Sequence, residues 1–139
     1  MNQEELNREK AEQIYMQLQM LQQQIKQLQQ QMEAVEQHLM EATVAKHSID
    51  ELKNTKIGSE ILVPVTSGIF VKASLLDNSE VLMNVGSKTV VTKGMDKAKE
   101  LIHSQLTEMK EVQQKMGNDL QEMIMQARLL EQEMQRLVG

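Results

Sequence analysis

Apolar residues in the first part of the chain recur at alternating intervals of three and four residues. Residues 4–54 contain no glycine or proline, and the positions between the apolar ones are mostly Gln, Glu and Lys, which are water-soluble and favour helix. The repeating positions, which we call the first seam, are Ala11, Ile14, Leu18, Leu21, Ile25, Leu28, Met32, Val35, Leu39 and Ala42. A 3.5-residue period held over this length predicts a coiled-coil helix over residues 4–54 rather than a disordered polar tract. After Ala42 the spacing changes, with Ala45, Ile49 and Leu52 next, which suggests a change of packing partner.

The same period returns over residues 95–138, which we expect to form a second coiled-coil helix. Its positions, which we call the second seam, are Ile102, Leu106, Met109, Gln113, Met116, Leu120, Met123, Ala127, Leu130, Met134 and Leu137. Gln113 is the polar exception, and a single polar residue in a seam can fix the register of a coiled coil. Gly117 lies inside this helix, where glycine costs about 1 kcal/mol relative to alanine, and it marks the expected position of a bend.

The two helices are expected to pair with each other as an antiparallel hairpin within one chain. Elements that follow one another in sequence usually pack together. In that arrangement Leu52 lies opposite Met95, Ile25 lies roughly opposite Met123, and Leu6 lies near the C-terminus. The alternative is a parallel coiled coil between chains, in which each seam needs a partner of its own.

Residues 59–93 change to a period of two, which is typical of β-strands. Branched and other aliphatic residues occupy every second position around Val63, Val71 and Met83. Turns are expected at residues 66–68, 77–78 and 86–88. Four short strands therefore form two β-hairpins, and Pro64, which cannot donate a ladder hydrogen bond, places its strand at an edge. Because isolated hairpins are marginally stable in water and open edges recruit other strands, the insert predicts oligomerisation.

The composition limits the classes of function. The 139 residues fit one ordinary domain, and Tyr15 and Phe70 are the only aromatic residues, which argues against a thick globular core. A net charge of −5 without a basic face argues against nucleic acid and anionic membranes as main partners. Cysteine is absent, which fits a reducing compartment, and no secretory signal or membrane span is expected.

No catalytic, cofactor or metal site is expected from the residue pattern. His38, His47 and His103 lack the neighbouring residues of a metal or acid–base motif. The segment Gly86-Ser87-Lys88-Thr89 lacks the upstream glycine, the residue order and the following helix of a phosphate loop. An enzyme is therefore the most distant of the possible functions.

The free ends of the two helices carry apolar residues that can form a tip. Met125, Leu129 and Val138 lie outside the second seam. The other helix contributes Leu6, Ile14, Tyr15 and Met16. Flexible surfaces rich in Met and Leu suit promiscuous binding. A frayed helix end without a binding role is equally compatible with these residues alone.

Three segments of the insert resemble the hairpin motifs of prefoldin α-type subunits. They are Ile61-Leu62-Val63-Pro64-Val65, Gly68-Ile69-Phe70-Val71-Lys72-Ala73 and Val81-Leu82-Met83-Asn84-Val85-Gly86. The helix lengths and seams agree with that family over essentially the whole chain, and two hairpins rather than one indicate the α type. Ser87-Lys88 departs from the pattern, because the family often has a second glycine there.

The resemblance implies an α+β fold with a single prefoldin-like domain over residues 1–139. In it, a long antiparallel coiled-coil hairpin carries two β-hairpins that join those of neighbouring subunits in a β-barrel. It also implies a cytoplasmic, ATP-independent chaperone (a holdase) that needs no cofactor or metal. Two α and four β subunits would form a hetero-hexamer, bind unfolded client proteins at the distal coiled-coil tips and transfer them to a group II chaperonin.

The same resemblance assigns roles to two sets of residues. The expected subunit interface is Val63, Val65, Phe70, Val71, Val81, Met83 and Val85. The expected client-binding residues are Leu6, Ile14, Tyr15, Leu130, Met134 and Leu137. The alternative function is a structural scaffold, either a filament-forming subunit or part of a specialised prefoldin-like complex.

Overall fold

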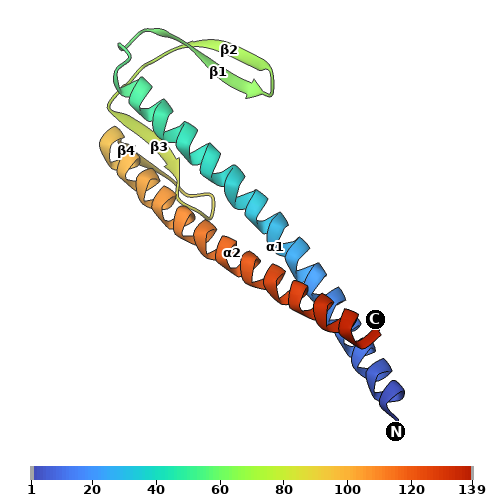
Figure 1. Ribbon diagram of the computed structural model, residues 1–139. Helices are drawn as coiled ribbons and strands as arrows, with labels where there is room; N and C mark the ends of the chain where they lie inside the picture. Colours follow the sequence, from blue (N-terminus) through green and yellow to red (C-terminus); the bar gives the residue numbers. More distant parts are fainter. Residues whose placement is uncertain (1, 139) are drawn as a thin grey trace. The chain divides into compact units, whose positions relative to one another are not determined.

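A computed structural model describes residues 2–138. The chain forms two long helices with two antiparallel β-hairpins between them, as predicted (Figure 1). In order, the elements are α1 (Gln3–Lys53), β1 (Glu60–Thr66), β2 (Ile69–Ser74), β3 (Glu80–Asn84), β4 (Val90–Gly94) and α2 (Met95–Val138). The described chain divides into two compact units: a terminal unit of residues 2–38 and 109–138, and a central unit of Leu39–Glu108.

The helix ends carry the charges and caps that their dipoles favour. The side-chain oxygen of Asn2 accepts a hydrogen bond from the backbone N–H of Glu5 at 2.8 Å, which caps α1. Lys53 lies in the last turn of α1 and Asp96 in the first turn of α2, where each charge complements the helix dipole. Both ends of α1 and the start of α2 therefore carry side chains that stabilise a helix terminus.

Each helix buries one apolar face, and this face is the predicted seam. Every position of both seams is buried or half-buried, and so are Ala45, Ile49 and Leu52 after the change of spacing. The most buried side chains of the terminal unit are Ile14, Leu18 and Leu21. Those of the central unit are Leu39, Ile49, Met95, Ala98, Ile102 and Leu106. Burial of these stripes is the main apolar contribution to folding.

Polar contacts beside the seams define an antiparallel register within each unit. The pairs in the central unit are Lys53 with Asp96, Lys99 with Asp50 at 2.7 Å, and Lys46 with His103 at 3.1 Å. Each step back along α1 is thus matched by an equal step forward along α2. In the terminal unit, the side-chain amide of Gln113 donates to the carboxylate of Glu36, which fits the same register.

The helices therefore pair antiparallel within one chain, and the intermolecular parallel coil is not the arrangement observed. The pairing differs slightly from the predicted one. With Lys53 against Asp96, Leu52 lies opposite residue 97 rather than Met95. Gln113, the one polar seam residue, does make a cross-helix hydrogen bond, as expected of a residue that specifies register.

The strands form two separate two-stranded sheets. β1 pairs with β2, with Val63 opposite Val71 and Pro64 opposite Phe70. β3 pairs with β4, with Met83 opposite Val91. The β1–β2 ladder is irregular between Pro64 and Thr66, as expected where proline cannot donate to the ladder. Every strand is therefore an edge strand.

The second hairpin closes with a tight turn that lacks the additional glycine. The backbone N–H of Thr89 donates to the carbonyl of Gly86 at 2.9 Å, and the two central residues, Ser87 and Lys88, have φ angles of 50° and 61°. Positive φ at both central positions is the signature of a type I′ turn. The hairpin thus keeps the preferred turn type, at the cost of placing two residues with side chains in the left-handed region.

Candidate binding and assembly surfaces

Metal-ligating side chains are present among the described residues but are not clustered. Among residues 2–138, no three His, Cys, Asp or Glu side chains are grouped so that they could hold a metal ion. His103 contacts Lys46, and the Nε2 atom of His47 lies 3.2 Å from a carboxylate oxygen of Glu51. Neither helix in this part of the chain is long and apolar enough to cross a membrane. The exposed apolar residues of the two units are the candidate sites.

The ionised groups of the central unit stabilise its framework. The hydrogen bond from Lys99 lowers the pKa of Asp50, and the hydrogen bond to Asp96 raises the pKa of Lys53. Between the hairpins, the hydroxyl and backbone N–H of Ser79 donate to Asp77 at 2.6 and 2.7 Å, which lowers the pKa of that carboxyl. These exposed interactions link α1 to α2 beside the seams and bridge residues of the inter-hairpin turn.

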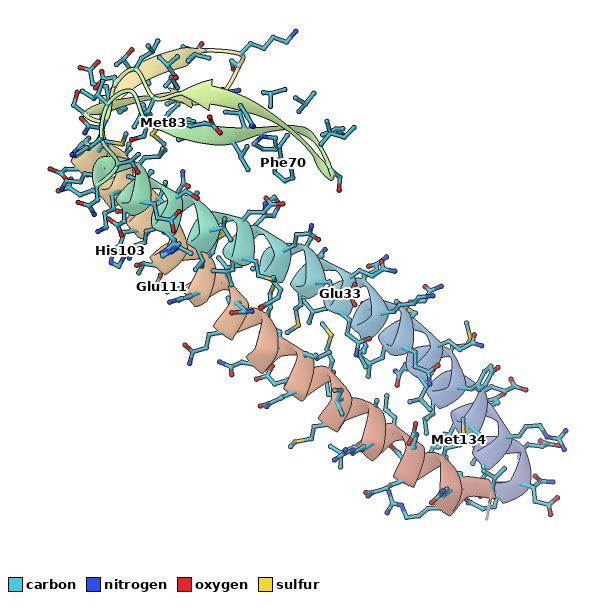
Figure 2. All side chains as sticks on the ribbon, turned by 90° about the horizontal axis from the view of Figure 1, so that it is seen from above. Glu33, Phe70, Met83, His103, Glu111 and Met134 are labelled. Carbon is cyan, nitrogen blue, oxygen red and sulfur yellow. The ribbon has the colours of Figure 1, made fainter. Side chains whose placement is uncertain are left out.

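The predicted interface residues lie on the two hairpins, and most of them are exposed. Val63, Val65, Phe70, Val71 and Val85 are exposed, whereas Val81 and Met83 are half-buried. Figure 2 labels Phe70 on the first hairpin and Met83 on the second. We call this set of seven residues the assembly surface.

The β1–β2 hairpin presents apolar side chains on both faces. Successive residues of a strand point to opposite faces, so Val63 and Val71 share one face, and Phe70 and Pro64 share the other. A two-stranded sheet that exposes apolar groups on both sides is poorly stable alone. The sequence prediction omitted several further exposed apolar residues of the hairpins, which are Leu62, Ile69, Leu82 and Val90. Their alternation with the predicted residues was a signal that these strands are apolar on both faces.

The helix ends of the terminal unit form an open groove that includes three predicted client-binding residues. This tip groove has a volume of about 760 Å³. Tyr15, Met134 and Leu137 line it, together with Met16 and Val138, and charged side chains of α1 stand among them. Figure 2 labels Met134 on α2. The hydroxyl of Tyr15 accepts a hydrogen bond from Gln19 at 2.9 Å.

The other three predicted client-binding residues lie elsewhere in the terminal unit. Leu6 is exposed outside the tip groove, and Ile14 is buried in the first seam. Leu130 lines a second groove of about 450 Å³, the side groove, with Met20, Leu21 and Leu129 and three glutamines. Sequence reasoning missed Met20, although its position one helical turn after Met16 places both on one face.

Known proteins resemble this chain in both sequence and fold. The sequence profile described as "Prefoldin subunit" matches residues 21–139. Prefoldin subunit alpha of Methanococcus aeolicus is 32% identical over 130 residues, covering 84% of this chain and 88% of the relative. Prefoldin subunit alpha of Thermofilum pendens is 29% identical over 93 residues, covering 67% of this chain and 72% of the relative.

A solved structure has the same fold. A chain of the filamentous PFD from Methanocaldococcus jannaschii, determined by cryo-EM, superposes with a TM-score of 0.73 and 16% sequence identity. The match covers 84% of this chain and 96% of the other. Both helices and the intervening hairpins therefore follow an architecture already observed by experiment.

Proposed function

The chain belongs to the prefoldin subunit family, and on that premise we propose that it is a non-enzymatic, ATP-independent holdase subunit. The observation that supports this most directly is the tip groove, where exposed Tyr15 and Met16 stand beside the half-buried Met134 and Leu137. An open apolar groove with flexible methionines suits the binding of varied non-native segments better than one defined ligand. Leu6 and Leu130 extend this surface, and the buried Ile14 supports it from the seam.

The assembly surface is the second part of the proposal. Its exposed apolar residues and unpaired strand edges favour association with the hairpins of other subunits. We propose a cytoplasmic hetero-hexamer of two α-type and four β-type subunits, joined through intersubunit β-barrels, that transfers clients to a group II chaperonin. Several weak tips on one particle would bind a client with high avidity through effective concentration.

Removing residues 130–139 tests the client-binding role. The truncation deletes Leu130, Met134 and Leu137 and leaves the hairpins intact. The truncated subunit should assemble normally, as measured by native mass spectrometry, but suppress aggregation of a denatured model protein less well. If the truncated complex suppresses aggregation as well as the full chain, the assignment of the tip is wrong.

Because the truncation also shortens α2, a point variant tests the tip groove without changing the length of the helix. Tyr15→Gln replaces an exposed apolar residue of the tip groove with a good helix former, and Val112→Gln does the same at an exposed position that lines neither groove. Tyr15→Gln should weaken client holding, whereas Val112→Gln should not. Equal loss in both variants would indicate a general effect on the helices.

A scaffold that forms filaments is the second candidate function. It is favoured by one observation, the fold match to a chain of a filamentous PFD. Native mass spectrometry with and without a β-type subunit separates the two candidates. A mixed hexamer supports the holdase, and a homopolymer that excludes the β-type subunit supports the filament.

A further inference from the structure

Four methionines of the described chain are exposed to solvent. Met16, Met20, Met40 and Met125 have exposed fractions of 66, 63, 62 and 65%, whereas Met95 is 4% exposed in the central unit. The remaining described methionines are half-buried. An exposed thioether is open to oxidants, and a buried one is shielded by its neighbours.

Two of the exposed methionines line the grooves of the terminal unit, and a third lies one helical turn from a residue of the side groove. Met16 lines the tip groove and Met20 lines the side groove. Met125 is one helical turn before Leu129, another residue of the side groove. We call Met16, Met20 and Met125 the methionine cluster. Met40 is in the central unit and lines neither groove, so it is equally exposed but differently placed.

Oxidation changes the chemistry of such a surface with little change in its shape. The sulfur lone pair of methionine attacks one oxygen of a peroxide, a sulfur–oxygen bond forms, and the oxygen–oxygen bond breaks. With hydrogen peroxide the other oxygen leaves as water, after proton transfer, so the sulfur loses two electrons and the peroxide gains them. The product, methionine sulfoxide, is polar, and reductases return it to the thioether.

We propose that the methionine cluster is an oxidation site through which peroxides reversibly weaken the binding of apolar segments in the two grooves. The inference rests on the proposed client-binding function. A sulfoxide brings a strong hydrogen-bond acceptor into each groove, and an apolar client segment would bury that acceptor without a donor, which is unfavourable. Thioethers, in contrast, pack against varied apolar partners.

Peptide mapping by mass spectrometry tests the site itself. The assembled protein is treated with hydrogen peroxide for increasing times. Met16, Met20, Met40 and Met125 should be oxidised well before Met95. Oxidation of Met95 as fast as the cluster would overturn the assignment of a selective site, whether or not the protein holds clients.

Matched variants test the consequence. After peroxide treatment, the wild-type protein should bind a fluorescently labelled denatured protein about tenfold more weakly, equivalent to about 1.4 kcal/mol, and methionine sulfoxide reductases should restore binding. A Met16→Leu/Met20→Leu/Met125→Leu variant, which still carries oxidisable Met40, should keep its affinity. After the same peroxide treatment, the Met40→Leu variant should lose affinity for the denatured protein as the wild type does.

The outcomes separate this proposal from the function on which it rests. If untreated protein binds no client, the proposed function fails. In that case the oxidation site is tested with a dye that fluoresces when it binds an apolar surface. Its fluorescence should fall on oxidation of the wild type and should not fall in the triple variant. If untreated protein binds clients and oxidation of the cluster changes neither affinity nor dye fluorescence, the proposed function stands and the oxidation site is wrong.

Discussion

Two residues in the β3–β4 turn lie in a backbone conformation that disfavours side chains. Ser87 and Lys88 both have positive φ, and the left-handed conformation costs about 1–2 kcal/mol for a residue with a Cβ. Lys88→Gly should therefore stabilise the turn by about 1 kcal/mol. The backbone N–H of Val85 donates to the carbonyl of Thr89 across this turn. Exchange of this amide hydrogen with solvent should therefore be about fivefold slower in Lys88→Gly than in the wild type.

The adjacent glycine provides the opposite test of that turn. Gly86 has a φ of 115°, although an added Cβ would meet no atom within 4 Å. Gly86→Ala should therefore destabilise the turn through backbone strain alone. Faster exchange in Lys88→Gly, or slower exchange in Gly86→Ala, would contradict this account.

The ionisable groups of the central unit predict how its stability depends on pH. Hydrogen bonds hold the pKa of Asp50 and Asp77 below the ordinary value of 3.8, and Asp96 raises the pKa of Lys53 above 10.5. A lowered carboxyl pKa stabilises the fold above 3.8, and this contribution is lost as the pH falls through the folded-state pKa. The raised pKa of Lys53 stabilises below 10.5 and is lost as the pH rises above it.

Melting temperature measured against pH checks this prediction. It should be nearly constant around neutrality, fall below about pH 4 and fall again above about pH 10.5. Asp50→Asn should reduce the drop mainly on the acid side, because the charge of Asp50 makes only the smallest contribution to the raised pKa of Lys53. An unchanged acid limb in that variant would show that the hydrogen bond from Lys99 contributes nothing measurable.

At the scale of the elements, α2 contains a glycine that is not required by its structure. Gly117 lies inside the helix, and an added Cβ would meet no atom within 4 Å. Gly117→Ala should stabilise the protein by about 1 kcal/mol, because alanine loses less backbone entropy in a helix. Ala34→Gly, at an exposed position of α1, should destabilise it by about the same amount. Chemical denaturation measures both, and a destabilising Gly117→Ala would mean that α2 needs the freedom of glycine.

The seams show how far helix packing can be predicted from sequence. Every seam position is buried or half-buried, because a 3.5-residue apolar period leaves each helix only one face to bury. The two hairpins followed equally well from period-two runs separated by turn residues. These elements could be predicted because their signals are local.

The contacts beside the seams could not be predicted in the same way. A shift of two residues between the helices leaves both seams buried but changes every pair of flanking residues. Lys53 against Asp96 and Gln113 against Glu36 therefore depend on a register that the apolar pattern leaves open. The same limit applies to the tip, where Ile14 is buried while Tyr15 beside it is exposed. The grooves depend on how two helix ends face each other.

For the whole molecule, the two proposed activities use separate residues. The grooves are in the terminal unit, and the hairpins are in the central unit. Variants of one surface should therefore leave the other intact, since substitutions that share no interaction partners usually contribute independently. The truncation at the tip and the variants of the hairpins can then be interpreted separately.

Phe70→Asp tests the assembly surface. Phe70 has an exposed fraction of 56%, so the substitution removes little burial within the chain and should leave its helical circular dichroism unchanged. In an assembled particle the same side chain would be buried, and an unpaired carboxylate there is strongly unfavourable. Native mass spectrometry should therefore show loss of the oligomer.

Val44→Asp places the same charge on an apolar residue of α1 with an exposed fraction of 64% and should assemble normally. Intact oligomers of Phe70→Asp would show that this hairpin face does not join subunits.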